Sequence, residues 1–499
     1  MQYVMGIDHG GTSSKAAIFD QKGNEIASAS GKTQMFTPGS GQTERDMETL
    51  YQVNCAVIRK TIEKAGVDPK DIVGVSFSGH GKGLYLWGND ERPARPGIVS
   101  TDSRAVSYIE QWNVDGTADK AFEKTRQSIL ACQPVALLSW IRDNEPGVLE
   151  NTKWIFGVKD YIRYRMTGEA FAEITDISGS SMVNLNTFSY DRDLMALYGL
   201  EDLMDKLPPL KYSADLCGSV TDDCAAQSGL VPGTPVAAGL FDIDACAISM
   251  DIVDEDHLAV IAGTWSINEY IAKSPVLDRS VKMNSLYCLP GYYLVEECSP
   301  TSASNQEWFV GEFLQELAQS KGKHPYEVSN EMAASVDVNA TLPVYLPYLF
   351  GGCDDARARA SFIGIDGGHT RAHLMRAVYE GVVFGHKLHI NRLMRHREHT
   401  TAIRMAGGVV NSPMWVQMFA DVLGQRIETI KASELGCLGA AMAAAVAAGL
   451  YPDLKTAASD MVQIGRIYTP NPDVFQAYEK KFKRWADIEN AMRGCWAML

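Results

Sequence analysis

The chain opens on the stretch that decides its fold, MGIDHGGTSSKAAIFD at residues 5–20. Apolar residues at 3–7 and again at 16–19 predict two strands, and the glycines between them suit the tight turn of a hairpin. Gly10 and Gly11 have no Cβ, so their backbone amides can face an anion at close range. The turn is therefore a candidate phosphate site as well as a connection between strands.

Polar side chains complete this turn. They are Thr12, Ser13, Ser14 and Lys15. Hydroxyl donors and an ammonium group suit a phosphate, although a hydroxyl-rich Gly-Gly hairpin can also be a plain turn. The glycines are not followed by the Gly-Lys-Ser/Thr of a Walker loop, and a strand stands where a dinucleotide fingerprint would have a helix. The choice between a phosphate site and a plain turn depends on the rest of the chain.

The composition is that of a large globular protein with an excess of acidic residues. With 499 residues, 46% of them hydrophobic, the chain can form two or more domains. Its formal net charge of −15 argues against nucleic acid as the main partner, because phosphate backbones are bound by basic surfaces. Signal-peptide features are missing from the first residues, and the most apolar window, 435–451, is too short to span a membrane. The ten cysteines form no Cys-x-x-Cys pair, so we expect no zinc site, no disulfide framework and a cytoplasmic location.

A glycine-rich loop follows the next buried strand. Helical spacing of apolar residues predicts a helix over 47–65 closed by Gly66, and residues 72–77 predict a buried strand. The strand runs into a loop in which His80 and Lys82 alternate with glycines. The two side chains could hydrogen-bond a hydroxylated ligand, or the loop could be a polar surface turn. Its position at a strand end favours the ligand.

Two further strand ends carry carboxylates. A strand at 98–100 leads to Asp102 and Arg104, which could address a diol together or pair with each other. A second strand, 236–240, leads to Asp242 where a helix begins. An aspartate there is commonly a helix N-cap, but a carboxylate aimed at a bound hydroxyl can also act as a general base. Asp244 could share either role.

The second half of the chain repeats the opening pattern. Residues 258–261 predict a strand, 262–266 a Gly-Thr turn, and the residues to Ile271 another strand. Two hairpins that can each hold phosphates suggest a duplicated architecture with a ligand between the halves.

A glycine pair lies further along the second half. Gly407 and Gly408 would let a flat group such as adenine approach the backbone, although such a pair can also be a simple turn. After them, Ser412 is a good N-cap for a helix that begins at Pro413 and ends before Gly424. A small-residue helix over 433–449 should pack tightly on a neighbour.

Together these stretches resemble the FGGY carbohydrate kinases over nearly the whole chain. The most specific part is ASFIGI at 360–365, a spacer of seven residues and HLMRAVYE at 373–380, which fit the C-terminal signature of the family. The N-terminal signature, around 134–144, has Leu137 where the family usually has lysine. Four loops look most like those of members that act on L-xylulose: 79–84, 239–242, 263–265 and 299–302.

The resemblance implies a fold and a set of site residues. The expected fold is α/β, with two actin-like (ribonuclease-H-like) domains around a deep cleft, a sugar-binding domain at 1–247 and an ATP-binding domain at 248–499. Asp242 matches the catalytic base, and Asp8 matches the carboxylate near the metal. The matching ATP-binding positions are Thr12, Ser13, Lys15, Gly263, Thr264, Gly408 and Ser412. The matching sugar-binding positions are His80, Lys82, Asp102 and Asp242.

The activity that the resemblance implies is phosphorylation of a terminal hydroxyl of a ketopentose by ATP and Mg²⁺. L-xylulose, giving L-xylulose 5-phosphate, is the expected substrate, and erythritol, D-xylulose, ribulose or glycerol are the alternatives within the family. An alternative of another class is an actin-like ATPase with a binding or assembly role. The expected partners are the sugar or polyol and Mg-ATP, with a homodimer left open and neither nucleic acid nor membrane expected.

Overall fold

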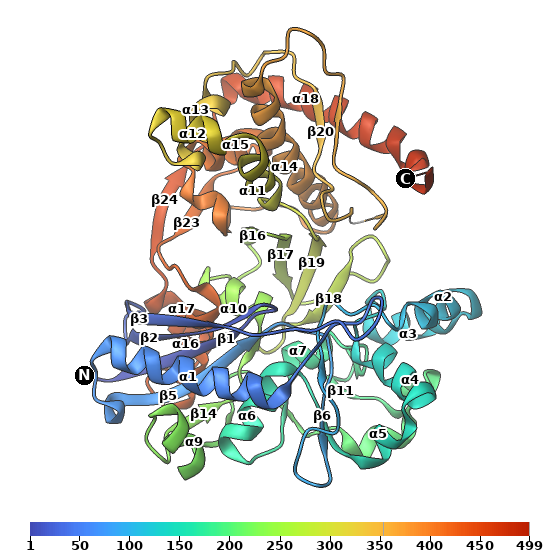
Figure 1. Ribbon diagram of the computed structural model, residues 1–499, viewed down its shortest axis with the longest axis vertical. Helices are drawn as coiled ribbons and strands as arrows, with labels where there is room; N and C mark the ends of the chain where they lie inside the picture. Colours follow the sequence, from blue (N-terminus) through green and yellow to red (C-terminus); the bar gives the residue numbers. More distant parts are fainter. Residues whose placement is uncertain (353, 499) are drawn as a thin grey trace. The chain divides into compact units, whose positions relative to one another are not determined.

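The computed structural model describes residues 1–352 and 354–498 and shows an α/β protein (Figure 1). Two seven-stranded sheets form its framework. The chain divides into two compact units that exchange segments of sequence. Unit 1 comprises Met1–Val253, Ile271–Leu294 and Ala432–Gln463, and unit 2 comprises Asp254–Tyr270, Val295–Lys431 and Ile464–Leu499. The sequence-based division after residue 247 stays a prediction.

The first sheet is built around the opening hairpin. In order, its strands are β13 (Leu216–Ser219), β14 (Pro235–Ala237), β5 (Ile72–Gly79), β1 (Tyr3–His9), β2 (Ser13–Asp20) and β3 (Glu25–Lys32), and β15 (Leu240–Phe241) also pairs with β5. The predicted hairpin is confirmed: β1 and β2 are antiparallel, and Asp8 stands opposite Lys15. The backbone amide of Gly10 closes the turn by donating to Ser13 O at 2.9 Å. Polar residues therefore gather at the end of this hairpin.

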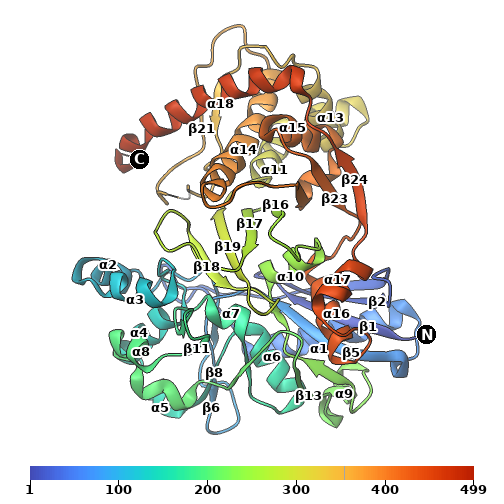
Figure 2. The ribbon, with the colours of Figure 1, turned by 180° about the vertical axis from the view of Figure 1, so that it is seen from behind.

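Two helices pack on the first sheet (Figures 1 and 2). The helix α1 (Met47–Ala65) lies on β2 and β3 and is closed, as predicted, by Gly66, which has φ 63°. Its N-cap is Asp46. The helix α16 (Leu435–Ala447) lies on β1 and β5. A Cβ on Gly6 of β1 would lie only 1.8 Å from Cys437 O, and one on Gly439 only 2.2 Å from Ala245 O. The tight packing predicted for the small-residue helix is confirmed.

Unit 1 also contains many short elements. Its other helices are α2 (Val106–Asp115), α3 (Thr117–Thr125), α4 (Pro134–Asn144), α5 (Pro146–Asn151), α6 (Val158–Thr167), α7 (Ile174–Ser178), α8 (Arg192–Leu197), α9 (Asp222–Ser228), α10 (Asp242–Ser249) and α17 (Leu454–Met461). Its short strands are β4 (Glu44–Arg45), β6 (Tyr85–Gly88), β7 (Gly97–Ile98), β8 (Thr152–Phe156), β9 (Ala172–Glu173), β10 (Val183–Asn184), β11 (Ser189–Tyr190) and β12 (Leu210–Lys211).

Two predicted strands are shorter than expected. The strand predicted over 98–100 ends at Ile98. The amide of Val99 still donates to Thr43 O at 3.0 Å, but the Thr43 amide donates to Asp102 Oδ2 at 2.7 Å instead of to the strand. The strand predicted over 236–240 is divided between β14 and β15. Gly239 lies between them with φ 100°, and a Cβ there would meet Phe77 O at 2.6 Å. A left-handed glycine pressed against β5 thus interrupts the strand.

The second sheet repeats the first in outline. Its order is β18 (Met283–Leu286), β19 (Tyr293–Ser299), β17 (Ser266–Ala272), β16 (His257–Ala262), β22 (Ala402–Ala406), β23 (Ile427–Ile430) and β24 (Ile464–Tyr468). The hairpin of β16 and β17 is antiparallel, and β16 pairs in parallel with β22, as β1 pairs with β5. The predicted repeat of the opening pattern is confirmed.

Helices make up most of the rest of unit 2 (Figure 2). They are α11 (Ser304–Phe313), α12 (Gln315–Lys321), α13 (Pro325–Ala334), α14 (Arg371–Leu393), α15 (Pro413–Leu423) and α18 (Pro472–Met492), with the short strands β20 (Val344–Leu346) and β21 (Ser361–Ile363). The prediction for α15 is confirmed: Ser412 is its N-cap, and Gly424 follows its last residue. No helix in the described part of the chain is both long and apolar enough to cross a membrane.

Candidate active site

The end of the first hairpin holds a charged pair. Lys15 Nζ lies 2.9 Å from Glu434 Oε2, and Glu434 immediately precedes α16. Of the other predicted phosphate ligands, Thr12 is exposed and Ser13 is half-buried in the same turn. The structure therefore brings these three residues together and adds a carboxylate that the sequence analysis did not single out.

The carboxylate of Asp8 lies against the first turn of α16. A Cβ on Gly436 would stand 2.8 Å from its Cγ, so only glycine leaves room for the aspartate. The start of a helix carries a partial positive charge, which favours an anion there. Burial, reinforced by the nearby charge of Glu434, raises the pKa of Asp8. This carboxylate is thus close to another negative charge and only partly solvated.

Asp242 stands at the first position of α10, directly after β15. The N-cap alternative is wrong, because Phe241 occupies that position and Asp242 Oδ1 accepts from the adjacent Ile243 amide at 2.9 Å. Burial and then the charge of Asp8 raise the pKa of Asp242 to about 8, while the ammonium of Lys82 opposes the rise. A carboxyl with such a pKa can accept a proton near neutral pH.

Asp244 has a different environment from Asp242. It is fully buried, and its Oδ1 accepts from the Cys288 amide at 2.9 Å. Burial raises the pKa of Asp244 well above its usual range. A carboxyl that is fully enclosed by protein cannot reach a bound hydroxyl, so it is unsuited to the general-base role that the sequence left open for it.

The loop after β5 packs on the residue that precedes Asp242. His80 is buried, and burial lowers its pKa to about 3, so the imidazole is neutral. Its Nε2 lies 3.5 Å from Tyr85 Oη. Lys82 has φ 65°, and its Nζ lies 5.6 Å from the ring centroid of Phe241. The structure therefore places the two predicted sugar-binding residues of this loop beside the start of α10.

Asp102 is held by protein groups. Its Oδ2 accepts from the Thr43 amide at 2.7 Å and pairs with Arg104 Nη2 at 2.8 Å, and its side chain is 0% exposed. Arg104 also pairs with Glu44 at 2.7 Å. The alternative in which Asp102 and Arg104 pair with each other is confirmed, while contact between Asp102 and a sugar stays a prediction.

Four predicted nucleotide-binding residues line one cavity of unit 2, of about 570 Å³. They are Gly263, Thr264, Gly408 and Ser412. Three lining residues that the sequence did not indicate are His324, Tyr326 and Asn330. The rings of His324 and Tyr326 are stacked with centroids 5.7 Å apart, and Ser412 Oγ donates to Asn330 Oδ1 at 2.7 Å. The cavity offers a flat ring wall, hydroxyl and amide groups, and one carboxylate, Glu307.

The two neighbouring glycines have different tasks. Gly407 has φ 94°, and a Cβ there would lie 2.5 Å from the carbonyl of Ala262, so the protein itself requires this glycine. A Cβ on Gly408 would meet no atom within 4 Å among the described residues. Close approach of a ligand is therefore expected at Gly408, and the role predicted for Gly407 belongs to backbone packing.

The Gly263-Thr264 turn is anchored from behind. The amides of Ser302 and Ala303 donate to Thr264 O at 2.9 Å and Gly263 O at 2.8 Å. His386 of α14 lies between Ser302 Oγ, 2.8 Å from its Nε2, and Ser266 Oγ, 3.1 Å from its Nδ1. Burial lowers the pKa of His386 to about 3. A neutral histidine thus links Ser266, which follows the turn, to Ser302, which binds Thr264 from behind.

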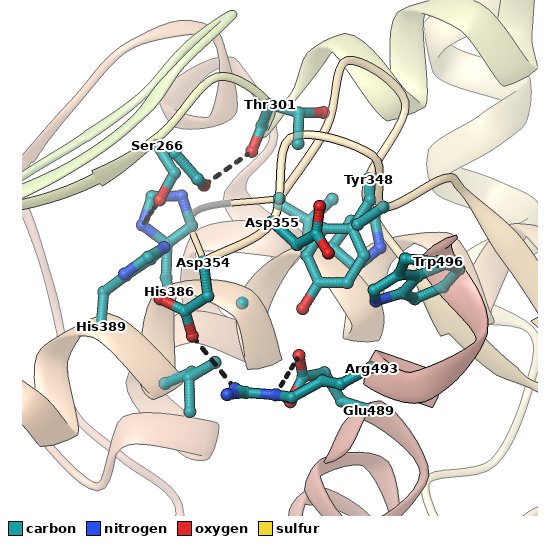
Figure 3. Close-up of a pocket in the computed structure, with 17 residues that line it drawn as sticks. Ser266, Thr301, Tyr348, Asp354, Asp355, His386, His389, Glu489, Arg493 and Trp496 are labelled. Carbon is teal, nitrogen blue, oxygen red and sulfur yellow. Dashed lines mark hydrogen bonds and ion pairs between the residues drawn. The ribbon is translucent and has the colours of Figure 1, made fainter. Parts of the chain in front are cut away.

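Figure 3 shows a second cavity of unit 2, of about 240 Å³, next to His386. Arg493 Nη2 lies 3.1 Å from both Asp354 Oδ2 and Glu489 Oε2 across this cavity. None of the predicted site residues is among the described residues that line it. The described residues that line it do not line the nucleotide candidate, so the two cavities are separate.

Two family domains and full-length relatives match this chain. Residues 3–249 match the N-terminal domain, and residues 258–448 the C-terminal domain, of the FGGY family of carbohydrate kinases. A "Probable L-xylulose kinase" of Pasteurella multocida (strain Pm70) is 35% identical over 494 residues, which cover 99% of both chains. The "L-xylulose/3-keto-L-gulonate kinase" of Escherichia coli (strain K12) is 35% identical over 495 residues, covering 99% of this chain and 98% of that protein.

Solved structures show the same fold. A ligand-bound xylulose kinase from Lactobacillus acidophilus superposes with a TM-score of 0.91 at 24% identity, covering 100% of each chain. Glycerol kinase from Plasmodium falciparum with ADP gives 0.86 at 17% identity, covering 99% of this chain and 98% of that one. The expected class of two actin-like α/β domains is confirmed. With both family domains and full-length relatives matched, the chain belongs to the FGGY family of carbohydrate kinases and is a sugar kinase.

Proposed function

We propose that this kinase transfers the γ-phosphoryl group of Mg-ATP to a terminal hydroxyl of L-xylulose, giving L-xylulose 5-phosphate. The names of the two relatives at 35% identity support this substrate. The observation that carries the chemistry is Asp242, whose pKa of about 8 makes it a far stronger base than an ordinary carboxylate. It stands beside the loop of His80 and Lys82, which supplies a neutral imidazole and a cation for a polyhydroxylated ligand.

In the proposed mechanism, Asp242 accepts the proton of the sugar hydroxyl while that oxygen attacks the γ-phosphorus in line. Phosphoryl transfer needs positioning and charge neutralisation more than covalent help. Lys15 and the hydroxyls of Thr12 and Ser13 bind phosphate oxygens, and Glu434 orients the lysine. The cavity that contains Gly408 and Ser412 binds the nucleoside.

The carboxylates of unit 1 fit a magnesium ion. Asp8 raises the pKa of Asp242, so the two negative charges repel each other and a cation between ATP and protein would relieve the repulsion. Within residues 1–352 and 354–498, no three His, Cys, Asp or Glu side chains are arranged to hold a metal. This suits Mg²⁺, which binds to one or two carboxylates and keeps waters and phosphate oxygens. We propose that Asp8 holds the ion, directly or through a water molecule. When bound, the magnesium ion would neutralise negative charge on the phosphates.

We also propose that the kinase is located in the cytoplasm. The described cysteines are all free thiols, which supports a reducing, cytoplasmic compartment. A homodimer stays a prediction.

A panel of acceptors tests the proposed substrate. ADP release would be measured with L-xylulose, D-xylulose, ribulose, erythritol, glycerol and 3-keto-L-gulonate at saturating Mg-ATP. Among the neutral acceptors, we expect L-xylulose to give the highest kcat/KM. A higher kcat/KM for another neutral acceptor would mean that this acceptor, and not L-xylulose, is the substrate. ATP turnover at the same rate with and without every acceptor would favour the actin-like ATPase.

A further inference from the structure

His386 of α14 lies behind the Gly263-Thr264 turn, and each nitrogen of its ring has a polar partner. The residue is 1% exposed. Its Nε2 lies 2.8 Å from Ser302 Oγ, and its Nδ1 lies 2.8 Å from Asn268 Oδ1 and 3.1 Å from Ser266 Oγ. All of these residues belong to unit 2. One buried ring therefore joins β17, which follows the turn, to the segment that precedes α11.

The contacts of Asn268 decide which nitrogen of His386 carries the ring proton. Asn268 Nδ2 donates to the backbone carbonyl of Glu297 at 3.2 Å, which fixes the orientation of the amide group. Its Oδ1 then faces His386 Nδ1 as an acceptor, so the proton is on Nδ1. Burial lowers the pKa of His386 to about 3, so the ring is neutral and Nε2 has no hydrogen. The Ser302 hydroxyl must therefore donate to Nε2.

Ser302 extends this restraint to the turn. Its backbone amide donates to Thr264 O at 2.9 Å, and the next amide, that of Ala303, donates to Gly263 O at 2.8 Å. Each of these carbonyl groups shares a planar trans peptide with the N–H group of the following residue, which points the opposite way. The amides of Thr264 and Trp265 are therefore directed away from Ser302 and Ala303. Backbone N–H groups held in this way suit phosphate oxygens.

A second buried histidine of α14 provides an internal comparison. His389 is 3% exposed, and its Nδ1 lies 2.9 Å from Glu297 Oε2. Ser266, His386 and His389 lie together on one side of the cavity in Figure 3. In the described part of the chain, the ring of His386 has a hydrogen bond to Ser302 and the ring of His389 has none. The two histidines thus share a helix and a similar burial but differ in their connection with the turn.

We propose that His386 is a positioning residue for ATP: through Ser302, it holds the Gly263-Thr264 turn in the orientation that binds phosphate oxygens. The proposal rests on the proposed function, because it takes this turn to be part of the Mg-ATP site. His386 acts from behind the turn and is not a catalytic residue. Loss of the link should weaken the binding of the phosphates, whereas the nucleoside, which we assign to the cavity of Gly408 and Ser412, should bind as before.

His386→Leu and His386→Gln test the proposal through a split between nucleotide and nucleoside. Calorimetric titration would measure the Kd of adenosine and of a non-hydrolysable ATP analogue with Mg²⁺. Leucine has a similar volume but no hydrogen-bonding group, so His386→Leu should raise the Kd of the analogue by roughly 10-fold, the effect of about one lost hydrogen bond. The Kd of adenosine should change by less than about 2-fold. Glutamine has a donor and an acceptor, as the neutral ring has, so His386→Gln should recover most of the affinity. Equal losses for both ligands, or no loss in His386→Leu, would overturn the proposal.

Ser302→Ala breaks the same link from its other end, and it tests the proposal even if His386→Leu does not fold. The variant removes the hydroxyl but keeps the backbone amide that binds Thr264. It should raise the Kd of the analogue and leave that of adenosine unchanged. Combined with His386→Leu, it should cause no further loss, because both changes remove one interaction. An unchanged Kd of the analogue in Ser302→Ala, or additive losses in the double variant, would contradict the proposal.

His389→Leu is the matched control for a general effect on packing. It removes a buried histidine from the same helix together with its contact to Glu297, so it should lower the thermal stability. The ratio of the two Kd values should nevertheless stay that of the wild type, because His389 does not hold Ser302. An equal change of this ratio in His389→Leu and His386→Leu would count against a specific role of His386.

The wild type separates this proposal from the proposed function. It should bind the analogue at least roughly 10-fold more tightly than adenosine, because the phosphates add charge-assisted hydrogen bonds. Equal affinities in the wild type would contradict the proposed ATP site, and the role of His386 with it. A wild-type preference for the analogue that His386→Leu retains in full would contradict the role of His386 alone.

Discussion

The turn between β1 and β2 carries charged side chains, whereas the turn between β16 and β17 is anchored by neutral hydrogen-bonding groups. At the first, Lys15 pairs with Glu434 and Asp8 lies against α16. At the second, Ser302 and the neutral His386 hold Gly263 and Thr264. The strands around both turns follow the same pattern. We therefore expect the repeated scaffold to serve two tasks, charge chemistry at the first turn and nucleotide binding at the second.

The largest expected effect comes from the charged side of this comparison. Asp242→Asn should lower kcat by about 10²- to 10⁴-fold, the usual contribution of a general base, while the affinity for ATP changes little. Steady-state kinetics and nucleotide titration would measure the two quantities. Asp244→Asn is the matched control, because Asp244 is fully buried and accepts from the Cys288 amide, so it is expected to have no base function. Near-normal kcat in a folded Asp242→Asn variant would remove the base from the mechanism.

The pH dependence should follow the same carboxylate. Asp242 must be ionised to accept a proton, and burial together with the charges of Asp8 and Asp176 raises its pKa to about 8, against the opposing Lys82. The value of kcat/KM should therefore fall as the pH decreases through 8, by roughly 100-fold at pH 6, since each pH unit below the pKa lowers the ionised fraction about tenfold. A profile that is flat between pH 6 and 9 would contradict this assignment.

A smaller effect is expected from the lysine of the first turn. Lys15→Ala should lower kcat by roughly 10- to 100-fold with every accepted sugar, because a phosphate contact does not depend on the acceptor. Glu434→Gln should have a weaker effect in the same direction, since it leaves the lysine in place but less firmly oriented. The double variant should resemble Lys15→Ala alone. A change confined to sugar preference would place Lys15 in the sugar site instead.

The neutral side of the comparison should respond through nucleotide affinity. Gly408→Ala should raise KM for ATP by about 10-fold with unchanged stability, because its Cβ enters space that is open in the protein. Gly407→Ala should lower the free energy of unfolding by on the order of 2 kcal/mol, because of its positive φ and the contact with Ala262. ATP titration and chemical denaturation would measure the two effects. If Gly408→Ala lowered the stability and Gly407→Ala raised KM for ATP instead, the roles assigned to the two glycines would be reversed.

Elements that depend on neighbouring residues could be predicted from the sequence. The hairpin, α1 with its caps Asp46 and Gly66, and the start of α15 at Ser412 are set by local spacing and capping. The fate of Asp102 could not be decided in the same way, because its partner Thr43 comes from an earlier segment of the chain.

Site residues contributed by distant segments were missed for the same reason. Glu434 reaches Lys15 from more than 400 positions further along the chain, and periodicity carries no signal of such a pair. His324 and Tyr326 are brought to the nucleotide cavity by the packing of unit 2 alone.

The close packing of α16 on β1 has a consequence for the order in which the protein can mature. The first strand is made long before the helix that covers Gly6, and Glu434, the partner of Lys15, follows that lysine by 419 positions. Contacts over such long stretches of chain form slowly. The nascent chain therefore holds an incomplete phosphate turn until α16 has been translated, and the kinase can become active only after that.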